Sequence, residues 1–138
     1  MAYHPHGNYV LWINGATLYA ELSGAWNMEA ALAFEQDMMK HARTLPAHWG
    51  HLVYLNHWEL GTPEITAVIE RLVHWCIENG LQRAANVYEP SGIKSAILKK
   101  MVVEEHGDFK RAVFDNPNAA AQWLTAEGFP TFANNHPT

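Results

Sequence analysis

Short β-rich runs alternate with amphipathic helical segments along most of this chain, and the two kinds differ in the period of their apolar residues. The expected strands are residues 9–13, 16–22, 51–56, 83–88 and 109–114, and the expected helices are residues 28–44, 63–79, 93–106 and 118–127. Strands that alternate with helices lie parallel in one sheet, joined by right-handed crossovers. The order ββαβαβαβα predicts an α/β fold: a mixed sheet of about five strands, an N-terminal hairpin plus mostly parallel strands, flanked by four helices.

Short motifs mark the ends of several of these elements. Asn14-Gly15 accepts the positive φ angles of a type I′ turn, so it predicts a hairpin between the first two strands. Asn27 is a favourable N-cap for the first helix, and Asn116 before Pro117 is typical of the start of the last one. Thr62, followed by Pro63, predicts the cap of the second helix.

Length and composition are those of one globular domain. The chain has 138 residues, 49% of them hydrophobic and 17% charged, which is enough to bury a core. We expect a single domain over residues 1–138, with a core at about 8–129 and an irregular tail at 130–138. The formal net charge of −5 argues against a nucleic-acid partner, which would need a basic surface.

The chain carries neither a disulfide nor a membrane signal. Cys76 is its one cysteine and falls on the apolar side of the second helix, where a buried, unreactive thiol is expected. No apolar run approaches the ~18 residues that cross a bilayer, so no membrane insertion is expected. The N-terminal residues Met-Ala-Tyr-His-Pro-His lack the basic start and apolar core of a signal peptide. A cytoplasmic location is expected.

Two loops are candidates for a binding site. In open α/β sheets ligands gather beyond the carboxyl ends of the strands, which here means residues 57–62 and 89–92. The candidate interaction or ligand residues in these loops or next to them are His57, Trp58, Glu59, Thr62, Tyr88 and Ser91. Trp58 has two interpretations: it closes the core by packing on Trp75 or the first helix, or it is an exposed interface anchor.

A hydrolase is a weaker interpretation of the same loops. Ser91 or Thr62 would be the nucleophile, His57 the base and Glu59 the orienting group, but the Gly-x-Ser-x-Gly pattern is absent. We therefore assign no catalytic residue.

Metal and cofactor sites are also not expected. His48 and His51 stand three residues apart, yet they flank Trp49-Gly50 at the start of a strand, where solvent-facing histidines are expected. Glycine-rich phosphate-binding loops are missing as well. We predict neither a metal nor a cofactor.

Three segments of the chain carry a family resemblance. LSGAWNMEAALAFEQDM (22–38), LVYLNHWELGTPEITAVIERLVHWCIENGL (52–81) and NAAAQWLTAEGF (118–129) together look like the STAS-like family. They are most similar to its sporulation stage II AA-like branch of small bacterial proteins. The resemblance covers residues 8–129. The relatives of this family include anti-sigma-factor antagonists, cytoplasmic domains of anion transporters and, by fold, lipid-carrying domains.

The resemblance implies a mixed sheet flanked by helices and a role in protein interaction. In the antagonists, a partner kinase phosphorylates a serine at the start of the second helix and so switches binding off. The corresponding loop here ends in Thr62, which makes this threonine the candidate phosphorylation site. The antagonists' Asp-Ser-Ser-Gly signature is replaced by Leu60-Gly61-Thr62-Pro63, so the hydroxyl is retained but the surrounding recognition sequence is not.

The first functional hypothesis is a non-enzymatic STAS-like interaction module of regulatory role, whose partner is another protein or a second copy in a homodimer. The alternative is a carrier of a small apolar ligand or lipid, bound between the sheet and the third helix. The residues expected to line that pocket are Ile97, Leu98, Met101 and Val102. Ordinary core packing is the simpler interpretation of those four side chains.

Overall fold

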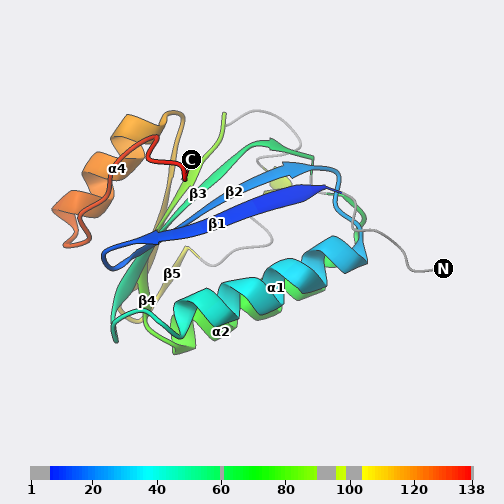
Figure 1. Cartoon of the computed structure of the whole chain (residues 1–138), viewed down its shortest axis with the longest axis horizontal. Helices are drawn as coiled ribbons and strands as arrows, with labels where there is room; N and C mark the ends of the chain where they lie inside the picture. Colours follow the sequence, from blue (N-terminus) through cyan, green and yellow to red (C-terminus); the bar gives the residue numbers. More distant parts are fainter. Residues whose placement is uncertain (1–6, 60, 90–95, 99–103, 138) are drawn as a thin grey trace.

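The computed structural model describes residues 7–59, 61–89, 96–98 and 104–137. It is an α/β fold with a six-stranded mixed sheet of order β1-β2-β3-β4-β6-β5 (Figure 1). The strands are β1 Asn8–Asn14, β2 Thr17–Gly24, β3 Trp49–Trp58, β4 Leu81–Val87, β5 Glu105–His106 and β6 Phe109–Phe114. The pairs β2–β3, β3–β4 and β4–β6 are parallel, and β1–β2 and β5–β6 are antiparallel.

The predicted N-terminal hairpin is present, but its turn is displaced by one residue. Asn14 still pairs with Thr17 in the sheet, so the two turn residues are Gly15 and Ala16. Gly15 has φ +62°, whereas Ala16 is not among the residues with a positive φ. This pattern is that of a type II′ turn, which needs glycine at its first central position only. The predicted type I′ turn at Asn14-Gly15 was therefore wrong.

Helices cover both faces of the sheet. Figure 1 shows α1, Met28–Ala42, and α2, Ile65–Glu78, together on one face, and α4, Pro117–Ala126, on the other. The predicted caps of α1 and α4 are confirmed: the Asn27 side chain accepts from the N–H of Ala30 at 3.0 Å, and that of Asn116 from Ala119 at 2.8 Å. Each cap satisfies a backbone donor that the first turn leaves free.

The sheet separates two layers of buried side chains. The larger layer lies between the sheet and the pair α1 and α2, and includes Trp26, Phe34 and Leu72. The smaller lies beneath α4 and includes Tyr19 and Leu124. Strand residues contribute alternately to the two layers, because successive side chains point to opposite faces of a sheet.

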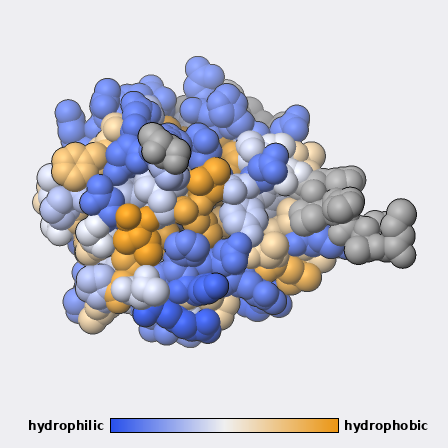
Figure 2. All heavy atoms as spheres, viewed as in Figure 1, coloured by the Kyte–Doolittle hydropathy of each residue, from blue (hydrophilic) through white to orange (hydrophobic). Residues whose placement is uncertain are grey.

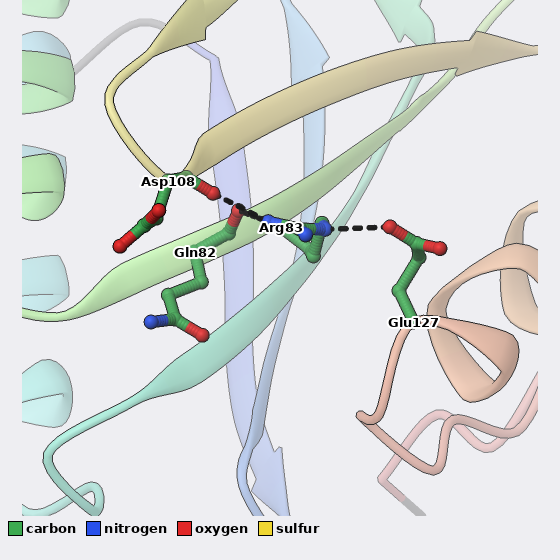
Figure 3. Close-up of polar contacts among 4 residues, drawn as sticks. All are labelled: Gln82, Arg83, Asp108 and Glu127. Carbon is green, nitrogen blue, oxygen red and sulfur yellow. Dashed lines mark hydrogen bonds and ion pairs between the residues drawn. The ribbon is translucent and has the colours of Figure 1, made fainter.

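Arg83 ties the second layer to the sheet. Its Nε lies 2.7 Å from Oε1 of Glu127 at the end of α4, and its Nη1 donates to the backbone oxygens of Gln82 and Asp108 at 2.8 and 2.5 Å (Figure 3). Asp108 belongs to the turn between β5 and β6. One guanidinium therefore joins β4, that turn and α4.

The C-terminal tail docks on the sheet without forming a helix or strand over residues 130–137. Its backbone N–H groups at Phe132 and Asn134 donate to the hydroxyls of Tyr19 and Tyr54, both at 3.1 Å. Phe129 is buried, but the Phe132 side chain is 58% exposed. Side chains hold the tail as well: the Trp12 Nε1 donates to Asn135 Oδ1 at 3.2 Å, and the His136 ring packs against Trp12.

Three predictions about the elements were wrong: the number of strands, the end of the third helix and the end of the third strand. The sheet has six strands instead of about five, because Glu105–His106 forms β5 at one edge. The third helix therefore cannot extend to His106, and only its residues 96–98 are described as helical. The third strand runs to Trp58, two residues past its expected end, so His57 and Trp58 belong to the sheet and not to a loop.

No helix in the described part of the chain is long and apolar enough to cross a membrane.

Candidate functional site

The end of β3 carries an extra residue that sets the positions of His57 and Trp58. Glu21 pairs with Tyr54, but Ser23 pairs with His57, so β3 advances three residues while β2 advances two. Such a bulge reverses which side chains face the core. As a result His57 is exposed and Trp58 is buried.

Trp58 closes one end of the core between the sheet and α1. It is 2% exposed and packs edge-on against Trp26, with ring centroids 5.5 Å apart. The interpretation of Trp58 as a core residue is therefore confirmed, although its aromatic partner is Trp26 and not Trp75. Its indole Nε1 has no hydrogen-bond partner among the described residues, which is unusual for a buried donor.

The turn after β3 is fastened to the segment that precedes α1. Glu59 N–H donates to the Gly24 oxygen at 3.0 Å, and Thr62 N–H donates to the Trp26 oxygen at 3.2 Å. Gly61 has φ +79°, and a Cβ built on it would lie 1.8 Å from the Trp26 oxygen. Only glycine fits there, because both the backbone conformation and the close approach exclude a side chain.

Thr62 does not cap α2, contrary to the sequence prediction. The helix begins at Ile65, its N-cap is Glu64, and no side chain makes the capping hydrogen bond. The Thr62 backbone oxygen instead accepts from Ile65 N–H at 3.2 Å in a tight turn. The Thr62 hydroxyl bonds to the Glu64 carboxylate, and this bond is the main cause of a lowered Glu64 pKa.

The end of β3 contacts Glu89 in the loop that follows β4. The Asn56 side-chain oxygen accepts from the backbone N–H of Glu89 at 3.0 Å. Tyr88 is 1% exposed, so its side chain belongs to the core and offers nothing to a partner at the surface. Ser91 lies outside the described residues.

The described members of the hydrolase set are not organised as a catalytic group. His57, Glu59 and Thr62 are exposed, and no hydrogen bond joins them within the part of the chain that the structure describes. A nucleophile, base and orienting group need such contacts. The geometry gives no support to catalysis at this loop.

A cavity of about 70 Å³ lies beneath the sheet face that carries α1 and α2. Most of its wall is apolar and includes Phe34 from α1, Val53 and Leu55 from β3, and Ile69 and Leu72 from α2. Trp58 forms part of the same wall.

The helical residues 96–98 reach this cavity through one side chain. Leu98 is buried and lines it, whereas Ile97 is 37% exposed. Met101 and Val102, the other two residues expected to line a pocket, lie outside the described residues. Of the two expected lining residues that the structure describes, Leu98 therefore lines the cavity and Ile97 does not.

Three polar residues face the cavity from three adjacent strands: His51, Asn86 and Arg111. His51 pairs with Ala84, and Ala84 pairs with Arg111, so His51 and Arg111 lie level with each other on the two sides of β4. Asn86 follows Ala84 by two residues and therefore shares its face. Arg111 Nη1 donates to Asn86 Oδ1 at 2.7 Å. We call His51, Asn86 and Arg111 the polar row.

Burial determines the charge states in the cavity wall. It lowers the pKa of His51 to about 4, opposed by a hydrogen bond to the Leu18 oxygen and assisted by the positive charge of Arg111. His51 is therefore neutral near pH 7. Burial also lowers the pKa of Arg111 to about 10, which leaves the guanidinium charged. Burial raises the pKa of the Cys76 thiol to about 12, and the expected burial of this cysteine is confirmed.

The polar row was missed by the sequence analysis, which placed His51 in solvent. His51 is instead 7% exposed, and its Nδ1 donates to the Leu18 oxygen at 2.7 Å. One signal in the sequence could have revealed Asn86 and Arg111. Both lie within β-rich runs, two residues from a buried apolar residue, and side chains two residues apart on a strand point to the same face. However, neither β-rich run by itself indicates which strands lie next to each other in the sheet.

Comparison with known proteins adds no identification: no protein-family model matches the chain, and no curated protein matches it.

Proposed function

We propose that this chain is a non-enzymatic STAS-like domain that binds a small, largely apolar molecule in the cavity beneath α1 and α2. The STAS-like arrangement is supported by the N-terminal hairpin followed by the parallel pairs β2–β3, β3–β4 and β4–β6. A cytoplasmic location belongs to the same proposal.

The cavity is the observation that carries this function. Its volume of about 70 Å³ is roughly five to seven times the 10–15 Å³ that one water molecule needs. A ligand with roughly that many non-hydrogen atoms would fill it. Well-packed cores have few voids larger than one water, and an apolar void forfeits the dispersion contacts of its lining. A small apolar ligand would restore those contacts.

Benzene, with six non-hydrogen atoms, is a suitable probe, because apolar cavities in proteins bind it. A ligand that binds only the folded state raises the melting temperature. We therefore expect benzene to raise the melting temperature of the wild type. Val53→Ile adds a methylene to the cavity wall and should reduce this shift.

Val68→Ile is the matched control. Val68 is equally buried, at 4% exposure, but does not line the cavity. The variant should keep the benzene shift of the wild type even if its own melting temperature differs. The proposal fails if benzene leaves the wild type unchanged, or if Val53→Ile and Val68→Ile respond alike.

A protein-interaction role is the second candidate. It is favoured by the rigid presentation of the exposed residues His57, Glu59 and Thr62 on a turn fastened to Gly24 and Trp26. In Figure 2, hydrophilic residues cover most of the visible face and apolar ones form small separate patches.

Trp58, being buried, is no longer the anchor of such an interface. Phosphorylation of Thr62 would place a phosphate beside the Glu64 carboxylate, which repels it. The test is a pull-down from lysate with the wild type and with the double variant His57→Ala, Glu59→Ala. The partner recovered is another protein or a second copy of this chain. If both baits recover the same partners, an interaction through this turn is excluded.

A further inference from the structure

We propose that the outer edge of β1 is the surface through which two copies of this chain form a dimer. The two β1 strands lie antiparallel, so that the sheet of one copy continues into the sheet of the other. The dimer does not depend on the cavity or on its ligand. The partner is a second copy, and the contact lies away from the turn that carries His57 and Glu59.

The backbone groups on the outer side of β1 are available for pairing. β1 is the first strand in the order of the sheet, and the described strand that it pairs with is β2. Asn14 and Thr17 close the hairpin, and hydrogen-bonded pairs alternate along an antiparallel ladder from there. The N–H and C=O groups of Tyr9, Leu11 and Ile13 therefore point away from β2. No hydrogen bond within the described residues occupies them.

The edge of β1 is open and carries none of the usual protection. Figure 1 shows β1 at the front of the sheet, with α1 on one side of it and α4 on the other, and in the same view Figure 2 shows apolar residues over β1. Val10 is 42% exposed, and four more β1 side chains are only partly buried. Natural edge strands are usually protected by a charge, a proline or a bulge. Asn8–Asn14 contains neither charge nor proline, and its ladder with β2 has no register shift.

The sequence of β1 is complementary to itself in the antiparallel orientation. A two-fold axis at Leu11 places Tyr9 opposite Ile13 of the second copy, so all the outward backbone groups find partners. The same axis places Val10 opposite Trp12 of the second copy. Aromatic residues opposite β-branched ones are favourable cross-strand pairs, and here they form on both faces of the sheet. This match favours a second copy as the partner.

The charges beside β1 do not oppose this pairing. Asp37 of α1 accepts a hydrogen bond from the Tyr9 hydroxyl. Glu21, which lies opposite Val10 on β2, is 3.3 Å from Nε2 of His136. Both carboxylates therefore have partners within their own chain. Because β1 itself carries no charge, no like charges face each other between the two strands.

The opposite edge of the sheet explains why the assembly stops at two copies. β5 has only two residues, Glu105 and His106, and the exposed residues Glu104 and Asp108 flank it. Short, charged edges resist pairing with another chain. A contact that uses the same edge of both copies is isologous and closed. The sheet therefore extends on the β1 side alone.

The first test is sedimentation equilibrium of the wild type over a range of concentrations. We expect a reversible equilibrium that reaches twice the 15.6 kDa mass of one chain. Val10→Lys would place two lysines on a diagonal across the axis, roughly 7–8 Å apart, where like charges repel. This variant should raise the dissociation constant of the dimer by roughly tenfold or more.

Val113→Lys is the matched control. Val113 is similarly exposed, at 38%, but belongs to β6, so this variant should keep the dissociation constant of the wild type. The double variant His57→Ala, Glu59→Ala should also dimerise as the wild type does, because neither residue is on β1. The proposal is overturned if the wild type stays a monomer up to millimolar concentration, if both lysine variants respond alike, or if the double variant loses the dimer.

Amide hydrogen exchange of the wild type locates the contact without any variant. The amides of Val10 and Trp12 bond to β2, so they should exchange slowly at every concentration. The amides of Tyr9, Leu11 and Ile13 face solvent in the monomer and should become protected only where the dimer forms. A dimer whose Leu11 amide exchanges as fast as in the monomer has its interface elsewhere and contradicts the proposal, even if Val10→Lys does not fold.

Discussion

At the residue scale, one inserted residue decides what Trp58 does. Without the bulge between Tyr54 and His57, the alternation of the strand would direct His57 into the core beneath α1 and Trp58 to the opposite face of the sheet. With it, the tryptophan packs on Trp26 and lines the cavity. The exposed residue left for a partner is the histidine.

His51 predicts how stability depends on pH. Its pKa is about 4 in the folded protein, below its ordinary value of 6.5, so between these values the unfolded chain binds the proton more strongly. The contribution of His51 to stability is therefore complete above pH 6.5 and is lost as pH falls toward 4. The loss amounts to about 3 kcal/mol of unfolding free energy.

Denaturant unfolding at a series of pH values measures this loss. His51→Leu should show a smaller decrease in unfolding free energy between pH 6.5 and 4 than the wild type. His57→Leu, at an exposed position, is the control and should follow the wild-type curve. If His51→Leu and the wild type lose stability in parallel, His51 is not the group responsible.

Sequence reasoning predicted some side chains well and others poorly, for physical reasons. Cys76 lies on a helix face marked by its own apolar periodicity, so its burial could be predicted locally. The burial of His51 depends on the strand beside it, where the Leu18 oxygen accepts a hydrogen bond from His51 Nδ1. The placement of the Arg111 side chain likewise depends on its hydrogen bond to Asn86, which belongs to a different strand. Contacts between strands distant in the sequence are not encoded in either segment alone.

At the element scale, the turn between β3 and α2 is held by backbone contacts rather than by a side-chain cap. Gly61→Ala tests this. The alanine would be forced into a left-handed conformation, which costs about 1–2 kcal/mol, and its Cβ would also meet the Trp26 oxygen at 1.8 Å. We expect a loss of unfolding free energy clearly above 2 kcal/mol in urea denaturation.

Gly107→Ala supplies the matched comparison. Gly107 also has a positive φ, +60°, but no described atom lies within 4 Å of the Cβ that would be added. Its replacement should cost only the conformational term of about 1–2 kcal/mol. Equal losses in the two variants would show that the contact with Trp26 does not constrain the turn.

Some elements could be predicted from residues that are neighbours in the sequence, and others depend on contacts between distant segments. The caps Asn27 and Asn116 were predictable because a cap bonds to an N–H three residues away. Thr62 carried the same signature, but the contact of its N–H with Trp26 placed a turn before the helix. Strand β5 has only two residues, too few for any pattern, and exists because β6 lies beside it.

At the scale of the whole molecule, the alternation of strands and helices was enough to predict an α/β sheet covered by helices. The cavity was not predictable in its position, because it depends on how side chains from β3, β4, β6, α1 and α2 fill one layer. A row of three polar residues within that layer prevents uniformly apolar packing. The opposite layer, closed by α4 and the tail, is tied to the sheet by Arg83 (Figure 3).

Xenon tests most directly whether the space beneath α1 and α2 accepts an apolar guest. Apolar cavities in proteins bind xenon, and its position can be read from anomalous diffraction. A crystal of the wild type under xenon pressure should show a xenon atom in contact with Val53, Ile69 and Leu72, the apolar side of the cavity. If those side chains close the space, or if xenon binds only elsewhere, the proposed ligand site does not exist.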